Sequence, residues 1–186
     1  MKKIIMYAMI MCMTFVLFTP QGIAVSNTKA TKELQQIKKY AKKGETPRSK
    51  GLKAHSTYAA IVKKLGKKKK EEASYYYEVK QYKFSNGVRF EFQGKPKKNS
   101  TQWIIDQKKK TYSVGSDLTN KPLTYKQIKK VFGKTTDFTY SGRTYEHTIS
   151  YKMGKYRIYF TTKPGNDQGY KKKLTDSTQF IRYQVQ

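Results

Sequence analysis

Cysteine, histidine and acidic residues are all scarce in this chain of 186 residues. The one cysteine, Cys12, lies in an apolar N-terminal segment. If that segment is removed, the rest of the chain has neither a thiolate nucleophile nor a disulfide. His55 and His147 are the only histidines, and their surroundings lack the spacing of a metal site. We therefore expect no cofactor and no bound metal.

A small secreted nuclease would have a similarly basic surface, so it is the class of enzyme to exclude. It would need acids and bases that converge on a phosphate, and Glu146 beside His147 is the only arrangement of that kind. Both residues fall on an expected strand, where adjacent side chains point to opposite faces. We therefore expect the protein not to be an enzyme.

Long hydrophobic runs are missing beyond residue 18. Residues 4–18 are apolar, follow Lys2 and Lys3, and precede small residues at Gly22 and Ala24. This run is shorter than the ~20 residues of a membrane-spanning helix, and the pattern is typical of a secretory signal peptide. We predict a signal peptide over residues 1–24 and a secreted protein. A secreted chain without disulfides favours a Gram-positive exporter, and any retention at the cell surface would be noncovalent.

Positive charge dominates the composition. The chain has 40 Lys and Arg residues against 12 Asp and Glu residues, a formal charge of +28. Removal of residues 1–24 takes away Lys2 and Lys3 and leaves +26. A charge of about 2 to 8 is enough to keep a small domain soluble. The excess favours a polyanionic partner, such as nucleic acid, teichoic acid, a sulfated glycan or an acidic membrane. The alternative is a protein that is merely basic and soluble.

An eleven-residue pattern occurs twice. TYAAIVKKLGK at 57–67 and TYKQIKKVFGK at 124–134 share six identical positions. Thr57 and Thr124 are candidate N-caps, and apolar residues follow each of them at helical spacing. Gly66 and Gly133 stand where a left-handed residue commonly ends a helix. We predict two short capped helices.

A β-hairpin is expected after each helix. In ISYKMGKYRIYF, residues 149–160, a two-residue loop at Gly154-Lys155 pairs Tyr151 with Ile158 and gives one apolar face. In QYKFSNGVRFEF, residues 81–92, a three-residue loop with a glycine bulge pairs Tyr82 with Phe90 and does the same.

These registers place like charges opposite each other on the second face. Lys83 lies across from Arg89, and Lys152 across from Arg157. Such pairs are destabilising, so two at equivalent places favour a surface that meets an anion; chance in so basic a chain is the alternative. Tyrosines near lysines can also stack on unpaired bases. The candidate polyanion-binding residues are Lys83, Arg89, Lys152, Arg157, Tyr159, Arg182, Lys68, Lys69, Lys109 and Lys172.

Four regions follow from these patterns. After the signal peptide, residues 25–51 form a basic, partly disordered linker with a marginal helix that carries Leu34, Ile37 and Ala41 on one stripe. Residues 52–118 and 119–186 are two α+β repeats. Further strands are expected at 101–106, 111–114 and 179–185. In the last, Ile181, Tyr183 and Val185 would share one face and Phe180, Arg182 and Gln184 the other.

The order of helix, glycine, tyrosine-rich hairpin and closing strands, repeated in tandem, resembles the β-lactamase-inhibitor-protein type of fold. The segment from PLTYKQIKKVFGK through YKMGKYRIYF resembles the staphylococcal immunodominant antigen B family. The second resemblance implies a secreted, surface-associated protein that binds extracellular nucleic acid without strong sequence preference. The first implies a concave sheet face that docks onto a protein, although the inhibitor's cysteines are absent here.

We therefore expect a secreted binding protein for polyanions, most favourably nucleic acid, that acts through basic sheet faces and lysine-rich loops. The alternative is a secreted inhibitor or ligand of a host protein that acts through the exposed sheet face.

Overall fold

The computed structural model describes residues 21–74, 79–94, 105–119, 122–165 and 173–186. Within these ranges the chain is a mixed α and β protein with three helices, α2 (Gln21–Ala41), α3 (Tyr58–Leu65) and α4 (Tyr125–Phe132), and one large antiparallel sheet. The expected α+β class is confirmed. None of the described helices is long and apolar enough to cross a membrane.

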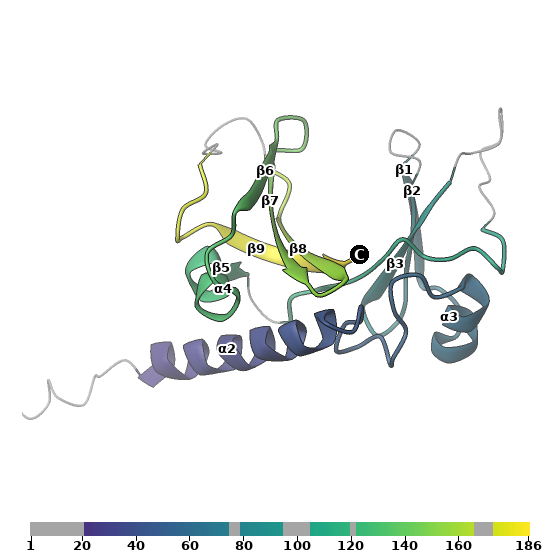
Figure 1. Ribbon diagram of the computed structural model, residues 1–186, viewed down its shortest axis with the longest axis horizontal. Coiled ribbons are helices and arrows are strands. Elements are labelled where there is room, and N and C mark those ends of the chain that lie inside the picture. Colours follow the sequence, from purple (N-terminus) through teal and green to yellow (C-terminus); the bar gives the residue numbers. More distant parts are fainter. Residues whose placement is uncertain (1–20, 75–78, 95–104, 120–121, 166–172) are drawn as a thin grey trace, which may run out of the picture.

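Nine strands of the described chain form the sheet, in the order β1-β2-β3-β4-β9-β8-β7-β6, with β5 paired to β9. Their bounds are β1 (Lys70–Ser74), β2 (Val79–Lys83), β3 (Val88–Gln93), β4 (Ser113–Asp117), β5 (Leu123–Thr124), β6 (Asp137–Ser141), β7 (Glu146–Met153), β8 (Tyr156–Thr162) and β9 (Gln179–Val185). The sheet is strongly bent, and all three helices lie on its convex side (Figure 1). Pairing of β4 with β9 joins residues 52–118 and 119–186 in one sheet.

The core lies between the helices and the apolar face of the sheet. An unbroken row of buried side chains crosses six strands through register partners: Tyr82, Phe90, Val114, Val185, Ile158 and Tyr151. The ring of Tyr58 on α3 packs against Tyr82, and that of Phe132 on α4 packs against Tyr151. Helices α3 and α4 are short, so this packing stabilises them more than their intrinsic helix propensity does.

Both predicted N-caps are confirmed. Thr57 Oγ1 accepts a hydrogen bond from the Ala60 amide at 3.3 Å. Thr124 forms a full capping box, because Gln127 Oε1 also accepts from the Thr124 amide at 2.9 Å. The C-caps differ from expectation. Gly66 and Gly133 have φ of +78° and +91° but ψ near 180°, a region that is essentially restricted to glycine and is not the left-handed helical one.

Both hairpin registers are confirmed. Tyr151 pairs with Ile158, and Tyr82 pairs with Phe90. In the first hairpin the Phe84 amide donates to the Val88 carbonyl at 2.9 Å, which closes the three-residue loop.

The expectation of a marginal helix and flexible linker before residue 52 is wrong. Helix α2 buries Ala30, Leu34, Ile37 and Ala41 in the core, and it packs beside α4 along the convex side (Figure 1). The following segment is also fixed, since Thr46 and Ser49 are buried and hydrogen-bond to each other. The stripe was recognisable in the sequence, but the sheet surface that stabilises it was not.

The predicted alternation in β9 is wrong at its start. Tyr183 and Val185 are buried as expected, but Phe180 is buried as well, because the register of β8 with β9 shifts between Thr161 and Thr162. A bulge of this kind changes which side chains face the core. Strand β4 also begins two residues later than predicted and continues to Asp117.

Some predictions fall outside the described residues. These are most of the signal peptide (1–20), Lys172, and residues 101–104 of an expected strand. The proposed cleavage after Ala24 falls within α2, before the first of its buried core residues, Ala30.

Gly115 lies close to β9 at the junction of the two strands. A Cβ at this position would lie 2.8 Å from the Tyr183 carbonyl oxygen and 3.1 Å from the Gln184 Cβ. We expect Gly115→Ala to lower the free energy of unfolding by about 1–3 kcal/mol, since β4 or β9 must shift. Urea denaturation would measure it. The control is Gly142→Ala, where a Cβ meets nothing within 4 Å; equal losses in both variants would contradict the close approach.

Candidate binding groove on the sheet

The concave face of the sheet is polar, and no described helix covers it (Figure 1). A cross-strand row runs through its middle from β2 to β6, and its register partners are Lys83, Arg89, Gly115, Gln184, Tyr159, Ser150 and Asp137. The row begins at the predicted basic pair, Lys83 and Arg89, and crosses the β4–β9 junction to strands β8, β7 and β6. Gly115 lies in this row at the β4–β9 junction, where it packs closely against Tyr183 and Gln184.

A groove of about 500 Å³ lies over this junction. Arg89, Gln184 and Tyr159 line it beside Gly115. The charged groups in the lining are three carboxylates and two guanidinium groups, a formal charge of −1. They belong to Glu72, Glu91, Glu146, Arg89 and Arg182.

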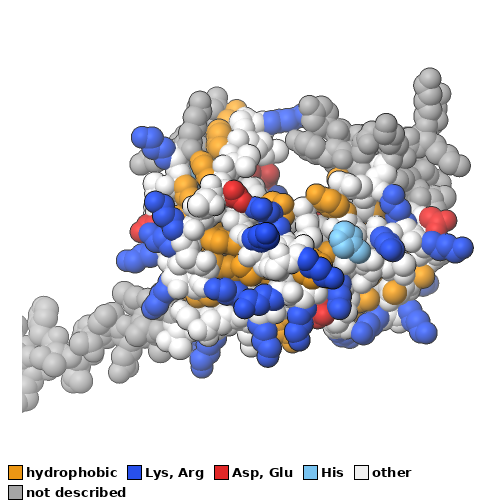
Figure 2. Space-filling model, viewed as in Figure 1, with side chains coloured by type: hydrophobic (Ala, Val, Ile, Leu, Met, Phe, Trp, Pro, Cys, Tyr) orange, Lys and Arg blue, Asp and Glu red, His pale blue; other side chains and the backbone are white. Residues whose placement is uncertain are grey.

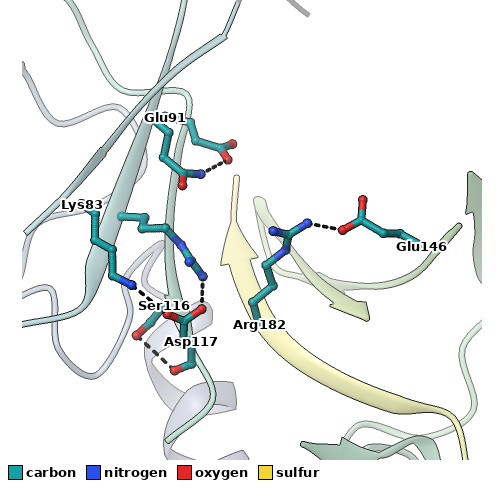
Figure 3. A network of polar contacts seen from close by, with 8 residues as sticks. Lys83, Glu91, Ser116, Asp117, Glu146 and Arg182 are labelled. Atoms are coloured by element: carbon teal, nitrogen blue, oxygen red, sulfur yellow. Dashed lines mark hydrogen bonds and ion pairs between the residues drawn. The ribbon is translucent and has the colours of Figure 1, made fainter. Parts of the chain in front are cut away.

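Lys83 and Arg89 lie opposite each other, as predicted, but a carboxylate compensates both. Arg89 Nη2 lies 2.5 Å from Asp117 Oδ1, and Lys83 Nζ lies 3.2 Å from Asp117 Oδ2 (Figure 3). Partial burial alone would raise the pKa of Asp117, but Arg89 and Lys83 outweigh it and hold that pKa below its ordinary value. Asp117 is therefore ionised at neutral pH and accounts for the stability of the like-charged pair.

Neighbouring side chains hold two of the three carboxylates in the groove lining, Glu146 and Glu91. Arg182 Nη2 lies 2.5 Å from Glu146 Oε1 (Figure 3). Glu91 accepts hydrogen bonds of 2.8 Å from both Gln81 Nε2 and Ser113 Oγ. Within the described part of the chain, no cation forms an ion pair with Glu91. The groove therefore contains fixed acceptors as well as donors.

The second basic pair is also confirmed in register and also partly compensated. Lys152 lies opposite Arg157. Arg157 forms an ion pair with Asp137, and its Nη1 donates to Ser150 Oγ at 2.9 Å. The hydrogen bond from Arg157 lowers the pKa of Asp137. Lys152 is exposed, and no carboxylate of the described residues pairs with it.

The described strands leave the concave face almost neutral. By register, its strands present six basic side chains, Lys70, Lys83, Arg89, Lys152, Arg157 and Arg182, and five acidic ones, Glu72, Glu91, Asp117, Asp137 and Glu146. Its formal charge is +1, against +28 for the chain. The basic side chains predicted for the sheet faces are present, but five of the twelve acidic residues lie among them and nearly balance their charge.

The remaining candidates lie in loops or in the groove. Lys68 forms an ion pair with Glu71 and lies 4.1 Å from the centre of the Tyr82 ring. Lys69 and Lys109 are exposed. Tyr159 lines the groove, where partial burial raises the pKa of its hydroxyl.

The two residues of the suspected nuclease pair point to opposite faces. Glu146 lies in the groove, whereas the ring of His147 is buried on the other face between Phe138 and Tyr140. The described residues contain no group of three or more side chains that could hold a metal ion.

Sequence reasoning missed the acidic partners and the groove itself. Asp117 lies beyond the predicted end of its strand, and Asp137 is on a strand that was not predicted. The strand order that brings β4 beside β9 was also unknown. One signal in the sequence did indicate a shared face. Within the hairpin, every second residue points to the same side, which groups Gln81 and Lys83 with Arg89 and Glu91.

Comparisons with known proteins show the fold alone. No family model matches the chain, and no curated protein matches it. Among solved structures, the chain is similar to the crystal structure of a DUF4309 family protein (YjgB) from Bacillus subtilis, with a TM-score of 0.55 and 15% sequence identity. The match covers 84% of this chain and 97% of that one. It therefore includes both halves of the bent sheet.

The role of Asp117 gives a pH-dependent prediction. A carboxyl with a lowered folded pKa stabilises the fold at pH values above its unfolded pKa, and this stabilisation is lost as the pH falls through the folded value. Asp117→Asn should therefore lower the free energy of unfolding at pH 7 by about 1 kcal/mol or less, since this side chain is 43% exposed. The difference should vanish at pH values below the folded pKa.

A double-mutant cycle with Arg89→Gln, followed by urea denaturation, would measure the coupling directly. Additive effects of the two substitutions at neutral pH would contradict the ion pair.

Proposed function

We propose that this chain is a secreted, non-enzymatic protein that binds polyanions, most favourably nucleic acid, through the lysines of its helical side and loops. The observation that supports this is the distribution of charge. The described strands of the concave face carry +1 of a total of +28, so nearly all the excess belongs to other parts of the chain. In the view of Figure 2, lysine and arginine side chains follow the lower rim, along which α2 runs in Figure 1. Repetition of a helix followed by antiparallel strands supports a tandem duplication as the origin of this shape.

The surroundings of α3 are one concentration of this charge. We call Lys63, Lys64, Lys67, Lys69 and Lys109 the α3 lysine cluster; all five are exposed. Lys63 and Lys64 are in the last turn of the helix, and Lys67 and Lys69 follow it. Lys109 lies at the other end, since its carbonyl accepts from the Tyr58 amide at 2.9 Å. Eight helical residues span about 12 Å, comparable to several phosphate spacings along a nucleic acid.

Helices α2 and α4 carry similar charge. Lys39, Lys42 and Lys43 are exposed at the end of α2, and Lys130 and Lys134 at the end of α4. Because α2 and α4 pack together, these lysines extend the basic surface along the convex side. Lysines of this kind act as point charges and contact phosphates without reading bases. Binding should therefore show little sequence preference.

The salt dependence of binding tests the proposal. The logarithm of the affinity for duplex DNA should fall linearly with the logarithm of the salt concentration, with a slope of about −0.9 per phosphate contact. Titration of fluorescent DNA, RNA and teichoic acid in parallel would rank the polyanions. Affinity that is unchanged in high salt would overturn the proposal.

Matched double variants locate the surface. Lys67→Gln with Lys69→Gln should reduce the steepness of the slope by up to about 1.8, because two phosphate contacts are lost. Lys83→Gln with Lys152→Gln removes the same charge from the concave face and should change the slope by less than half as much. A larger effect of the second pair would assign the binding to the sheet face instead.

A second candidate function is supported by the uncovered concave face. Its near neutrality and its groove suit the docking of a host protein better than the docking of a polyanion. Recovery of one stoichiometric plasma protein by the nuclease-treated chain, lost on substitution of Tyr159, would favour this candidate.

A further inference from the structure

The groove differs in charge from the rest of the molecule. Its lining has a formal charge of −1 in a chain of +28. Neighbouring side chains hold all three carboxylates: Arg182 pairs with Glu146, Gln81 and Ser113 donate to Glu91, and Lys70 pairs with Glu72 at 2.6 Å. The side chain of Glu146 is only 14% exposed. An anion that entered the groove would meet these carboxylates at short range, which disfavours a phosphate or sulfate there.

Two other classes of ligand are also disfavoured. A small cation is repelled by the net charge of the whole chain as it approaches. An apolar ligand would bury the charged and amide groups of the lining without replacing their hydrogen bonds, which is costly. These constraints leave an uncharged ligand that is rich in hydrogen-bonding groups.

The lining offers donors and acceptors close together. A guanidinium group has five N–H donors, and the ion pairs of Arg89 and Arg182 each use one nitrogen. Gln184 supplies both a donor and an acceptor, and Thr161 a hydroxyl. Partial burial raises the pKa of Tyr159, so its hydroxyl keeps its proton at neutral pH. Its ring offers an apolar surface with a polar end.

We propose that the groove over the β4–β9 junction binds a neutral oligosaccharide. Each sugar hydroxyl both donates and accepts, as do Gln184 and Thr161, and the planar end groups of Arg89, Arg182 and Glu91 span two neighbouring hydroxyls. The ring of Tyr159 packs on the apolar face of a sugar. Gly115 lines the groove between them and presents its backbone to the sugar. The site is separate from the α3 lysine cluster.

Nuclear magnetic resonance of the full mature chain tests this directly. The probes are cellotetraose, tetra-N-acetylchitotetraose, maltotetraose and mannotetraose, added to ¹⁵N-labelled protein in ~1 M salt, where the Debye length is about 3 Å and polyanion binding is suppressed. At least one probe should bind with a Kd of about 1 mM or lower, typical of a weak specific site. The shifted amides should include Gly115 and Gln184, and the affinity should be unchanged in low salt.

Two variants separate specific binding from general effects. Tyr159→Ser and Gln184→Ala should each weaken binding about tenfold or more, while Lys152→Gln, outside the groove on the same face, should leave it unchanged. The amide spectra of the variants would show that the fold is retained.

Three results would overturn the proposal: no shifts with any of the four probes, shifts that lie outside the groove, or equal affinity in all variants. Occupation of the groove by a host protein, with no effect of any sugar on that complex, would overturn it as well. Because nucleic-acid binding is measured by its salt slope, the failure of one proposal leaves the other intact.

Discussion

Pairing of β4 with β9 is the contact on which the rest of the structure depends. It joins two sets of strands that are distant in sequence, and it makes the apolar row continuous from Tyr82 to Tyr151. The same pairing places Arg89 and Tyr159 in one row on the other face. A single register thus determines both the core beneath the sheet and the groove above it. Gly115 permits the close approach of the two strands, and its backbone lines the groove.

The placement of the few acidic residues is the second constraint on the structure, because it decides where the basic side chains are neutralised. On the concave face Asp117 and Asp137 lie beside arginines that would otherwise repel nearby cations. Each of these carboxylates comes from a strand outside the hairpin it stabilises. The chain is thus very basic overall and yet has one face on which charges are balanced. Repulsion among the lysines at the ends of α2, α3 and α4 is tolerated because these side chains are exposed, so that solvent and salt screen them.

Local patterns predicted the parts of this fold, whereas long-range pairing could not be predicted from them. The caps at Thr57 and Thr124 and the registers of both hairpins follow from neighbouring residues, and all four are confirmed. The packing of α2, the bulge that buries Phe180, and the partnership of Arg89 with Asp117 depend on which strands become neighbours. For the same reason the basic pairs were found in the sequence but their compensation was not. The groove requires the β4–β9 pairing, for which no local pattern exists.

Within the described part of the chain, exposed lysines lie at the ends of α2, α3 and α4, whereas the concave face has balanced charges, so the helical side is the more positive one. In the field of an extended anionic polymer or surface, such a molecule rotates before it makes contact. It then arrives with α2, α3 and α4 toward the polymer and with the concave face toward the solvent. The bend of the sheet therefore does more than enclose a groove, because on an anionic surface it would direct the groove away from that surface.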